Sequence, residues 1–156
     1  MTFRGAHRAP APEGIELLAA TSDDELRGVA EVQWEAYQEG GEVPDPLVRA
    51  HRRLLELGGL VVLARDIQTA EPVGGGSCTA PHQGATELTS VAVRERYRRR
   101  GIAEAMTRWL AREMRAGGSD LVFLMAAGDA EASIYERAGF ETTSEILHIS
   151  LPKAGV

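Results

Sequence analysis

Five arginines occupy the seven positions from Arg94 to Arg100, directly before Gly101 and Ala103. Guanidinium groups bind phosphate oxygens through paired N–H donors, so this density of arginine favours an anion site. Gly101 lets the backbone approach a ligand closely and Ala103 carries only a small side chain, so successive amide N–H groups can point at one anion. We predict a pyrophosphate site formed by six residues: Arg98, Arg99, Arg100, Gly101, Ile102 and Ala103. The alternative interpretation is a solvated basic turn.

Two regular elements must position this turn. The apolar residues Val91, Ala92 and Val93 predict a strand that enters it, and the apolar periodicity after Ile102 predicts a helix that leaves it. The N-terminus of that helix adds partial positive charge and free N–H groups at the same place. The pattern R-x-x-G-x-A is weak by itself, and its position between a strand and a helix makes it fairly specific.

A second motif, IYERAGF, spans Ile134 to Phe140 at the end of a predicted short helix. Together the two motifs resemble those of the GCN5-related N-acetyltransferase (GNAT) family, Q/R-x-x-G-x-G/A between a strand and a helix and Y-x-x-x-G-F further downstream. The resemblance covers roughly residues 14 to 151. It implies an α+β GNAT fold, with a mixed central sheet of about six to seven strands flanked by about four helices.

The resemblance also implies a reaction and a co-substrate. An acetyl group would pass from acetyl-CoA to a primary amine of a small molecule or peptide, by direct attack in a ternary complex. Main-chain groups of Val91, Ala92 and Val93 would pair with the pantetheine arm like an added strand. The N–H of Val93 or Val91 would polarise the thioester carbonyl.

Two side chains are the catalytic candidates that the resemblance implies. Tyr135 would act as the general acid for the leaving thiolate, or would instead be a core tyrosine that only packs. Glu87, four residues before Val91, would be the base that deprotonates the amine, or would be a solvated or arginine-paired carboxylate. The other candidates for the base are Glu35, Glu39, Glu42, His82 and His148.

Two positions depart from the family pattern. The position after Arg98 is commonly glycine and is Arg99 here, whose side chain can project outward without blocking the anion site. Many members carry an asparagine seven residues before the tyrosine, where it helps to hold the coenzyme, and this chain has Gly128 there. That coenzyme contact is therefore in doubt. We expect the neighbouring Asp129 to cap the following helix.

Composition sets further limits. The chain has 156 residues and a formal net charge of −6, which argues against a general binder of nucleic acid or of anionic membranes. A single cysteine, Cys78, excludes an internal disulfide framework and fits a reducing compartment. Because the sequence shows neither a membrane-spanning segment nor a signal peptide, we expect a cytoplasmic protein. The histidines share no ligand spacing with Cys78, so we expect no metal site. The sequence leaves open whether the protein forms a homodimer.

We expect residues 1–13 to be a flexible leader and residues 14–156 to form one domain. The periodicity predicts the following elements in chain order: a strand over 15–19, a helix capped by Thr21 or Ser22 and running to about residue 38, a helix over about 45–57, an antiparallel meander of strands over 60–64, 73–79 and 87–93, a helix over 102–116, a strand over 121–125, a helix over 129–138 and a strand over 145–151. The glycines at 74–76 lie within a strand and indicate a bulge or a close backbone approach.

Two alternatives to an acetyltransferase remain. One is a GNAT enzyme that uses a different acyl donor. The other is a non-catalytic GNAT-fold module that binds a CoA thioester as a sensor or regulator.

Overall fold

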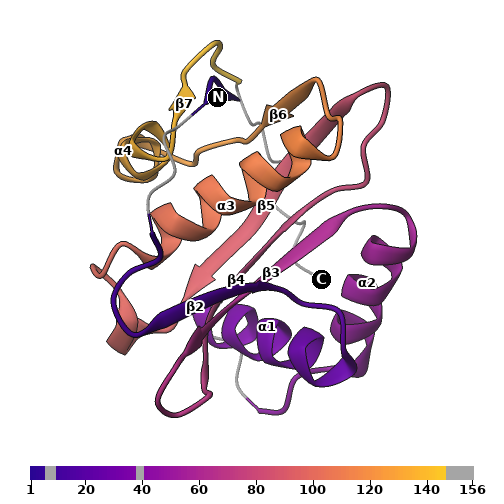
Figure 1. Cartoon of the computed structure of the whole chain (residues 1–156), viewed down its shortest axis with the longest axis vertical. Coiled ribbons are helices and arrows are strands. Elements are labelled where there is room, and N and C mark those ends of the chain that lie inside the picture. The colour runs from indigo at the N-terminus through magenta and orange to yellow at the C-terminus, as the bar shows by residue number, and fades with distance from the viewer. Residues whose placement is uncertain (6–9, 38–40, 147–156) are drawn as a thin grey trace, which may run out of the picture.

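The computed structural model describes residues 1–5, 10–37 and 41–146 of the chain. Within these residues, seven strands form one mixed sheet in the order β2-β3-β4-β5-β6-β1-β7. The strands are β1 (Thr2–Phe3), β2 (Ile15–Ala19), β3 (Leu60–Asp66), β4 (Pro72–Cys78), β5 (Ala85–Val93), β6 (Leu121–Phe123) and β7 (Phe140–Glu141). The same residues form the helices α1 (Asp23–Ala36), α2 (Asp45–Glu56), α3 (Ile102–Ala116) and α4 (Asp129–Arg137), and the 3-10 helix η1 (Glu95–Tyr97). The predicted α+β fold is confirmed (Figure 1).

The helices cover both faces of the sheet. A Cβ built on Gly75 of β4 would lie 2.7 Å from Val29 Cγ1 of α1, whereas one built on Gly74 would lie 2.9 Å from Met106 Cε of α3. Thus α1 packs on one face, with α2 beside it, and α3 packs on the other, with α4 beside it (Figure 1). The two faces bury separate hydrophobic clusters, one including Ile15, Met106, Leu110 and Val122 and the other including Leu26, Val29, Val61 and Leu63.

Local sequence explains where the helices begin. Ser22 Oγ accepts a hydrogen bond from the N–H of Glu25, and the Glu25 carboxylate accepts one from the N–H of Ser22. This reciprocal capping box satisfies two free donors at the start of α1. Of the two predicted caps, Ser22 is therefore the one used. Pro46 occupies the first turn of α2, where its missing N–H costs no helical hydrogen bond.

The predicted antiparallel meander of β3, β4 and β5 is confirmed, and β5 then pairs in parallel with β6. That parallel pairing joins Ala85–Glu87 to Leu121–Phe123 and goes no further. From Leu88 to Val93, β5 therefore has a strand partner on one side alone among the described residues. The register with β4 shifts between Gly75 and Ser77, where Ser90 takes a φ of 58°. This β-bulge lies at the middle of the half-paired segment.

Two features of the chain ends differ from the expectation. Residues 1–13 were expected to form a flexible leader, yet Thr2 and Phe3 form β1 between β6 and β7. A two-residue strand has no period-2 pattern, and its partners lie more than a hundred residues away in the sequence. In the predicted strand over 145–151, Glu145 and Ile146 are not in a strand, and the other positions lie outside the described residues.

No helix in the described part of the chain is both long and apolar enough to cross a membrane.

Candidate active site

The turn that enters α3 leaves the helix N-terminus uncapped. Gly101 is the N-cap residue, with a φ of 78°, and no side chain caps the first turn. Arg99, two residues earlier, also has a positive φ of 61°, which explains why this position is commonly glycine in proteins with this motif. The free N–H groups at the start of a 15-residue helix form a site suited to an anion. Ile102 is buried, so it can contribute its backbone alone.

Two of the five arginines do not surround this turn. Arg94 donates to the Glu35 carboxylate at 2.7 Å and to the carbonyl of Pro72 at 2.8 Å. Arg96 forms an ion pair with Glu71. Although the density of five arginines favoured an anion site in the sequence, these two guanidinium groups are held by carboxylates of the protein. The carboxylates that pair with them lie on α1 and on the β3–β4 hairpin. These partners are distant in the sequence, so no local sequence pattern could predict the pairing.

The other three arginines stay close to the turn. Arg98 Nε donates to the carbonyl of Val93 at 3.2 Å, so this side chain folds back onto the end of β5. Arg100 places its guanidinium carbon 5.1 Å from the centroid of the Tyr97 ring. Arg99 is exposed and has no hydrogen bond or ion pair to the described residues. Arg99 and Arg100 are thus the side chains free to reach a phosphate.

The end of β5 offers backbone groups on its open side. The N–H of Arg94 donates to the carbonyl of Val73 in β4 at 2.9 Å, and the preceding pair in register is Val93 with Gly74. Hydrogen-bonding direction alternates along an antiparallel strand, so the N–H and C=O of Val93 point away from β4. The carbonyl accepts the Arg98 guanidinium there. The N–H of Val93 is therefore placed where an extended ligand could accept from it.

Glu87 points to the α1 side of the sheet. Gly75 faces α1, Ser77 lies two residues further along β4, and Ser77 pairs with Thr89. Glu87 lies two residues before Thr89, so alternation places its side chain on that same face. The Glu87 side chain is half-buried, and no ion pair with it is found in the described part of the chain. Of the two alternatives to a catalytic base, the described residues therefore show no arginine-paired carboxylate, and a solvated carboxylate remains.

Tyr135 lies on α4, half-buried against the α3-side cluster. Burial raises the pKa of its phenol above the ordinary value, and the nearby Glu131 and Tyr37 raise it further. Among the described residues the Tyr135 hydroxyl has no hydrogen-bond partner. Tyr135 is therefore a protonated, unengaged donor at neutral pH.

The other candidates for the base are less well placed. Glu35 is paired with Arg94, and His82 is exposed at the β4–β5 turn. Glu39 and His148 lie outside the described residues. Glu42 is exposed and lines a hollow beside α1.

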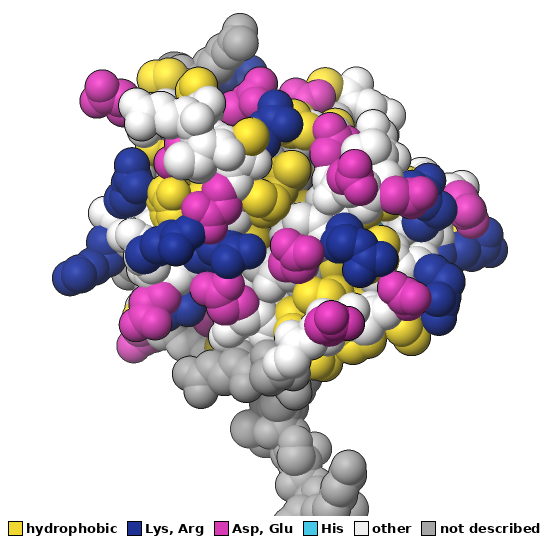
Figure 2. All heavy atoms as spheres, turned by 90° about the horizontal axis from the view of Figure 1, so that it is seen from below, with side chains coloured by type: hydrophobic (Ala, Val, Ile, Leu, Met, Phe, Trp, Pro, Cys, Tyr) yellow, Lys and Arg dark blue, Asp and Glu magenta, His cyan; other side chains and the backbone are white. Residues whose placement is uncertain are grey.

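That hollow has a volume of about 660 Å³ and lies between α1, the loop before α2 and the end of β5. Its walls carry Trp34, the ion pairs Arg27–Asp45 and Arg94–Glu35, and the carboxylates of Glu31 and Glu42. Neither Glu31 nor Glu42 has an ion-pair partner within the described ranges. Carboxylates therefore outnumber guanidinium groups here. The mixture of charges also appears across the face in Figure 2, where acidic and basic side chains are interspersed.

Known proteins share the sequence pattern and the fold of this chain. The model of the acetyltransferase (GNAT) family matches residues 26–140, which is most of the chain. The chain belongs to the GNAT acetyltransferase family. No match to the sequence was found among curated proteins.

Several solved structures are similar to this GNAT chain. Glucosamine-6-phosphate N-acetyltransferase from Arabidopsis thaliana is 16% identical, with a TM-score of 0.73 over 88% of this chain and 99% of its own. An aminoglycoside antibiotic 6'-N-acetyltransferase from Acinetobacter baumannii is 16% identical, with a TM-score of 0.68 over 90% of this chain and 100% of its own. A GCN5-related N-acetyltransferase from Sphaerobacter thermophilus is 25% identical, with a TM-score of 0.68 over 83% of this chain and 42% of its own. The first two likenesses concern the fold alone.

The start of α4 differs from the expectation for this GNAT chain. Asp129 was expected to cap the helix, but the N-cap is Gly128, and no side chain caps it. Instead Glu131 accepts from the N–H of Ala127 at 3.0 Å. An acidic residue at the third helical position reaches back in this way when the N-cap residue has no side chain.

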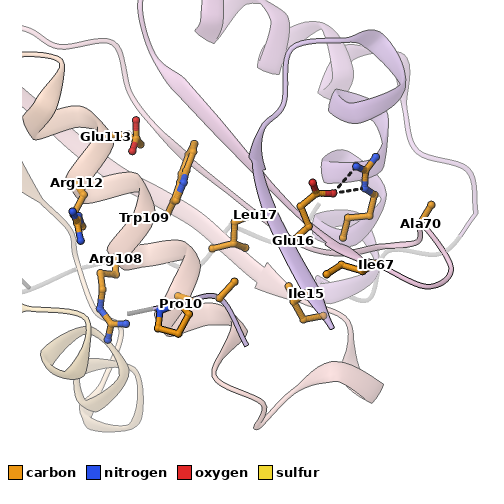
Figure 3. Close-up of a pocket in the computed structure, with 13 residues that line it drawn as sticks. Pro10, Ile15, Glu16, Leu17, Ile67, Ala70, Arg108, Trp109, Arg112 and Glu113 are labelled. Atoms are coloured by element: carbon orange, nitrogen blue, oxygen red, sulfur yellow. Dashed lines mark hydrogen bonds and ion pairs between the residues drawn. The ribbon is translucent and has the colours of Figure 1, made fainter. Parts of the chain in front are cut away.

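A second hollow is separate from these residues. It has a volume of about 880 Å³ and lies between β2 and α3, with Leu17 and Trp109 in its lining (Figure 3). Ile15 and Ala105 belong to its lining, whereas none of the predicted catalytic or coenzyme residues does. Its position therefore gives no reason to move the candidate site away from β5.

Three residues around the site were missed by the sequence analysis. Gln33 is buried on α1 and donates to the carbonyl of Ser90 at 2.9 Å, which ties α1 to the bulge of β5. A signal existed, because Gln33 is a polar residue on the same helical face as Leu26 and Val29. The other two, Tyr97 and Asp66, join the turn before α3 to the β3–β4 hairpin. Their contact spans 31 residues and had no local signature.

Within the described ranges, no group of three His, Cys, Asp or Glu side chains is placed to hold a metal ion. Cys78 is buried, and its burial raises the pKa of the thiol to about 12. Its thiol is therefore protonated and unreactive at neutral pH.

Proposed function

We propose that this protein is an acetyl-CoA-dependent N-acetyltransferase whose acceptor is a primary amine of a small molecule or peptide. One observation carries the proposal: the uncapped start of α3 directly follows a strand whose outer edge is open. An anion site and a row of free strand groups suit a ligand that has a pyrophosphate at one end and an amide-bearing arm at the other. Coenzyme A has both.

Acetyl-CoA supplies the activated acetyl thioester, and residues of this chain bind it and direct proton movement. The first-turn N–H groups of α3, with Arg99 and Arg100, hold the pyrophosphate. The N–H of Val93 donates to the thioester carbonyl oxygen, and Val91 and Ala92 border the arm. A donor fixed in this position stabilises the negative charge that develops on that oxygen in the transition state.

Proton transfer completes the mechanism on this chain. Glu87 accepts the proton of the acceptor ammonium, directly or through water, so that the amine can attack in a ternary complex. Tyr135 gives its phenolic proton to the departing thiolate. The two groups lie on different elements, β5 and α4. In this proposal one of them deprotonates the attacking amine and the other protonates the leaving thiolate.

The charge of the hollow beside α1 supports a cationic acceptor. Glu31 and Glu42 line it without a basic partner among the described residues, and it opens on the face that carries Glu87. An ammonium group is attracted by uncompensated carboxylates beside an aromatic wall such as Trp34. The three similar structures reported above all carry names of N-acetyltransferases, and only this class of reaction is taken from them into the proposal.

The test is release of free thiol from acetyl-CoA in the presence of a panel of primary amines. We expect amine-dependent release, faster with polycationic amines than with neutral or acidic ones. Longer acyl-CoA thioesters in parallel reactions test the alternative of a different acyl donor. Tight CoA binding without release from any donor, across the whole panel, would support a non-catalytic binding module instead.

A further inference from the structure

Tyr97 lies directly before residues 98–103, the turn that the proposed function assigns to the coenzyme (the coenzyme turn). It connects this turn to the β3–β4 hairpin. Its side chain is 8% exposed and belongs to the α3-side cluster with Ile15 and Ile102. Its hydroxyl donates to Asp66 Oδ2 at 3.1 Å. Asp66 ends β3, so this bond joins the turn to the β3–β4 hairpin across the sequence.

The Asp66 carboxylate is itself held in place. Its Oδ1 accepts from the N–H of Gln68 at 2.9 Å and from the N–H of Thr69 at 3.2 Å. These backbone bonds, with the Tyr97 hydroxyl, hold the pKa of Asp66 below its ordinary value. One oxygen thus closes the hairpin turn while the other accepts from Tyr97, and the carboxylate is charged at neutral pH.

The Tyr97 ring also contacts two arginines. The guanidinium carbons of Arg100 and Arg96 lie 5.1 Å and 5.4 Å from its centroid, within the range of cation–π attraction. Arg96 is paired in turn with Glu71 of the hairpin. The ring therefore restricts Arg100, one of the two side chains free to reach a phosphate.

We propose that Tyr97 is a positioning residue of the coenzyme site, which fixes the 98–103 turn through Asp66 and orients Arg100 through its ring. This inference rests on the proposed function. The turn contains two positive φ values, at Arg99 and Gly101, which a free chain would leave readily. A turn held in its binding conformation does not have to be ordered when the ligand arrives, so affinity is higher.

The test variant is Tyr97→Phe, which removes the hydroxyl and keeps the ring beside both arginines. We expect the Kd for CoA and the KM for acetyl-CoA to rise about tenfold, the effect of losing one hydrogen bond to a charged group. The kcat at saturating acetyl-CoA should stay within about twofold, because Tyr97 touches none of the reacting atoms. Tyr97→Leu, which removes the ring as well, should raise both constants further.

The matched control is Glu16→Gln. It removes the ion pair with Arg65, the neighbour of Asp66 in β3, without touching the coenzyme turn. The control should bind CoA like the wild type. Equal losses in Glu16→Gln and Tyr97→Phe, or a loss of kcat at unchanged KM, would overturn the positioning role.

The two proposals fail in different ways. If the wild type does not bind CoA, the proposed function fails and this inference fails with it. If the wild type binds CoA and Tyr97→Phe binds it within twofold, the inference alone is overturned.

Discussion

At the scale of single residues, the two catalytic candidates differ in what surrounds them. Tyr135 is half-buried with a free hydroxyl, and Glu87 faces the α1 side without an arginine partner among the described residues. Neither side chain is hydrogen-bonded or ion-paired to another side chain among the described residues. Each role can be tested by removing one functional group while keeping the shape.

Tyr135→Phe removes the phenolic hydroxyl and little else. If the hydroxyl protonates the leaving thiolate, turnover should fall by roughly 100-fold while the affinity for CoA is kept. Because the folded pKa of Tyr135 is raised, the group stays protonated through neutral pH, and its contribution is lost only as pH rises beyond the ordinary phenol range near 10. The measurement is kcat between pH 6 and 10 for both proteins. Turnover within a few-fold of wild type would make Tyr135 a packing residue.

Glu87→Gln tests the base. Gln cannot titrate, so the acidic limb of the rate against pH should flatten and the rate should fall, while CoA binding is unchanged. The profile should be recorded with acceptors of different basicity. A limb that persists in the variant and follows the pKa of the acceptor amine would show that the amine loses its proton without Glu87.

At the scale of elements, the glycines of β4 explain how close α1 lies to the sheet. A Cβ on Gly75 would lie 2.7 Å from Val29 Cγ1 and 3.3 Å from Val29 Cα, closer than packed side chains tolerate. The glycine run therefore serves helix–sheet packing, as its place within a strand indicated. It also brings α1, with Gln33, against the bulge of β5 beside the site.

Gly75→Ala should therefore destabilise the fold, by about 1–3 kcal/mol, because α1 must move away from β4. The matched control is Gly128→Ala, where the backbone is extended and no atom lies within 4 Å of the new Cβ. Its free energy of unfolding should change by about 0.5 kcal/mol or less. Urea unfolding of both variants compares the two sites. Equal stability of Gly75→Ala and wild type would mean that α1 is not seated as the structure places it.

The sequence predicted the elements well where they have a clear period. The long helices α1, α2 and α3 and the strands of the meander lie within a few residues of their expected bounds. The two-residue strands β1 and β7 were missed, since so few residues show no alternation and their pairing depends on partners distant in the chain. For the same reason the Tyr97–Asp66 contact and the pairing of Arg94 with Glu35 could not be read from the sequence.

At the scale of the whole molecule, the proposed anion site lies in an acidic protein. The formal net charge is −6, yet the residues before α3 carry five arginines, of which Arg99 and Arg100 remain near the anion site. On the face shown in Figure 2, acidic and basic side chains are interspersed, whereas the turn before α3 combines exposed arginines with an uncapped helix N-terminus. Family membership is consistent with that placement.

The measurement that tests this account most directly is calorimetric titration of acetyl-CoA into the wild type, Gly101→Asp and Gly118→Asp. Gly118 also has a positive φ and open space around it, but it lies beyond the other end of α3, so it controls for backbone strain and added charge. We predict that wild type and Gly118→Asp bind equally, and that Gly101→Asp, still folded, binds at least about 100-fold more weakly, because its carboxylate occupies the anion site. Unchanged affinity in a folded Gly101→Asp variant would contradict the placement of the coenzyme at this turn.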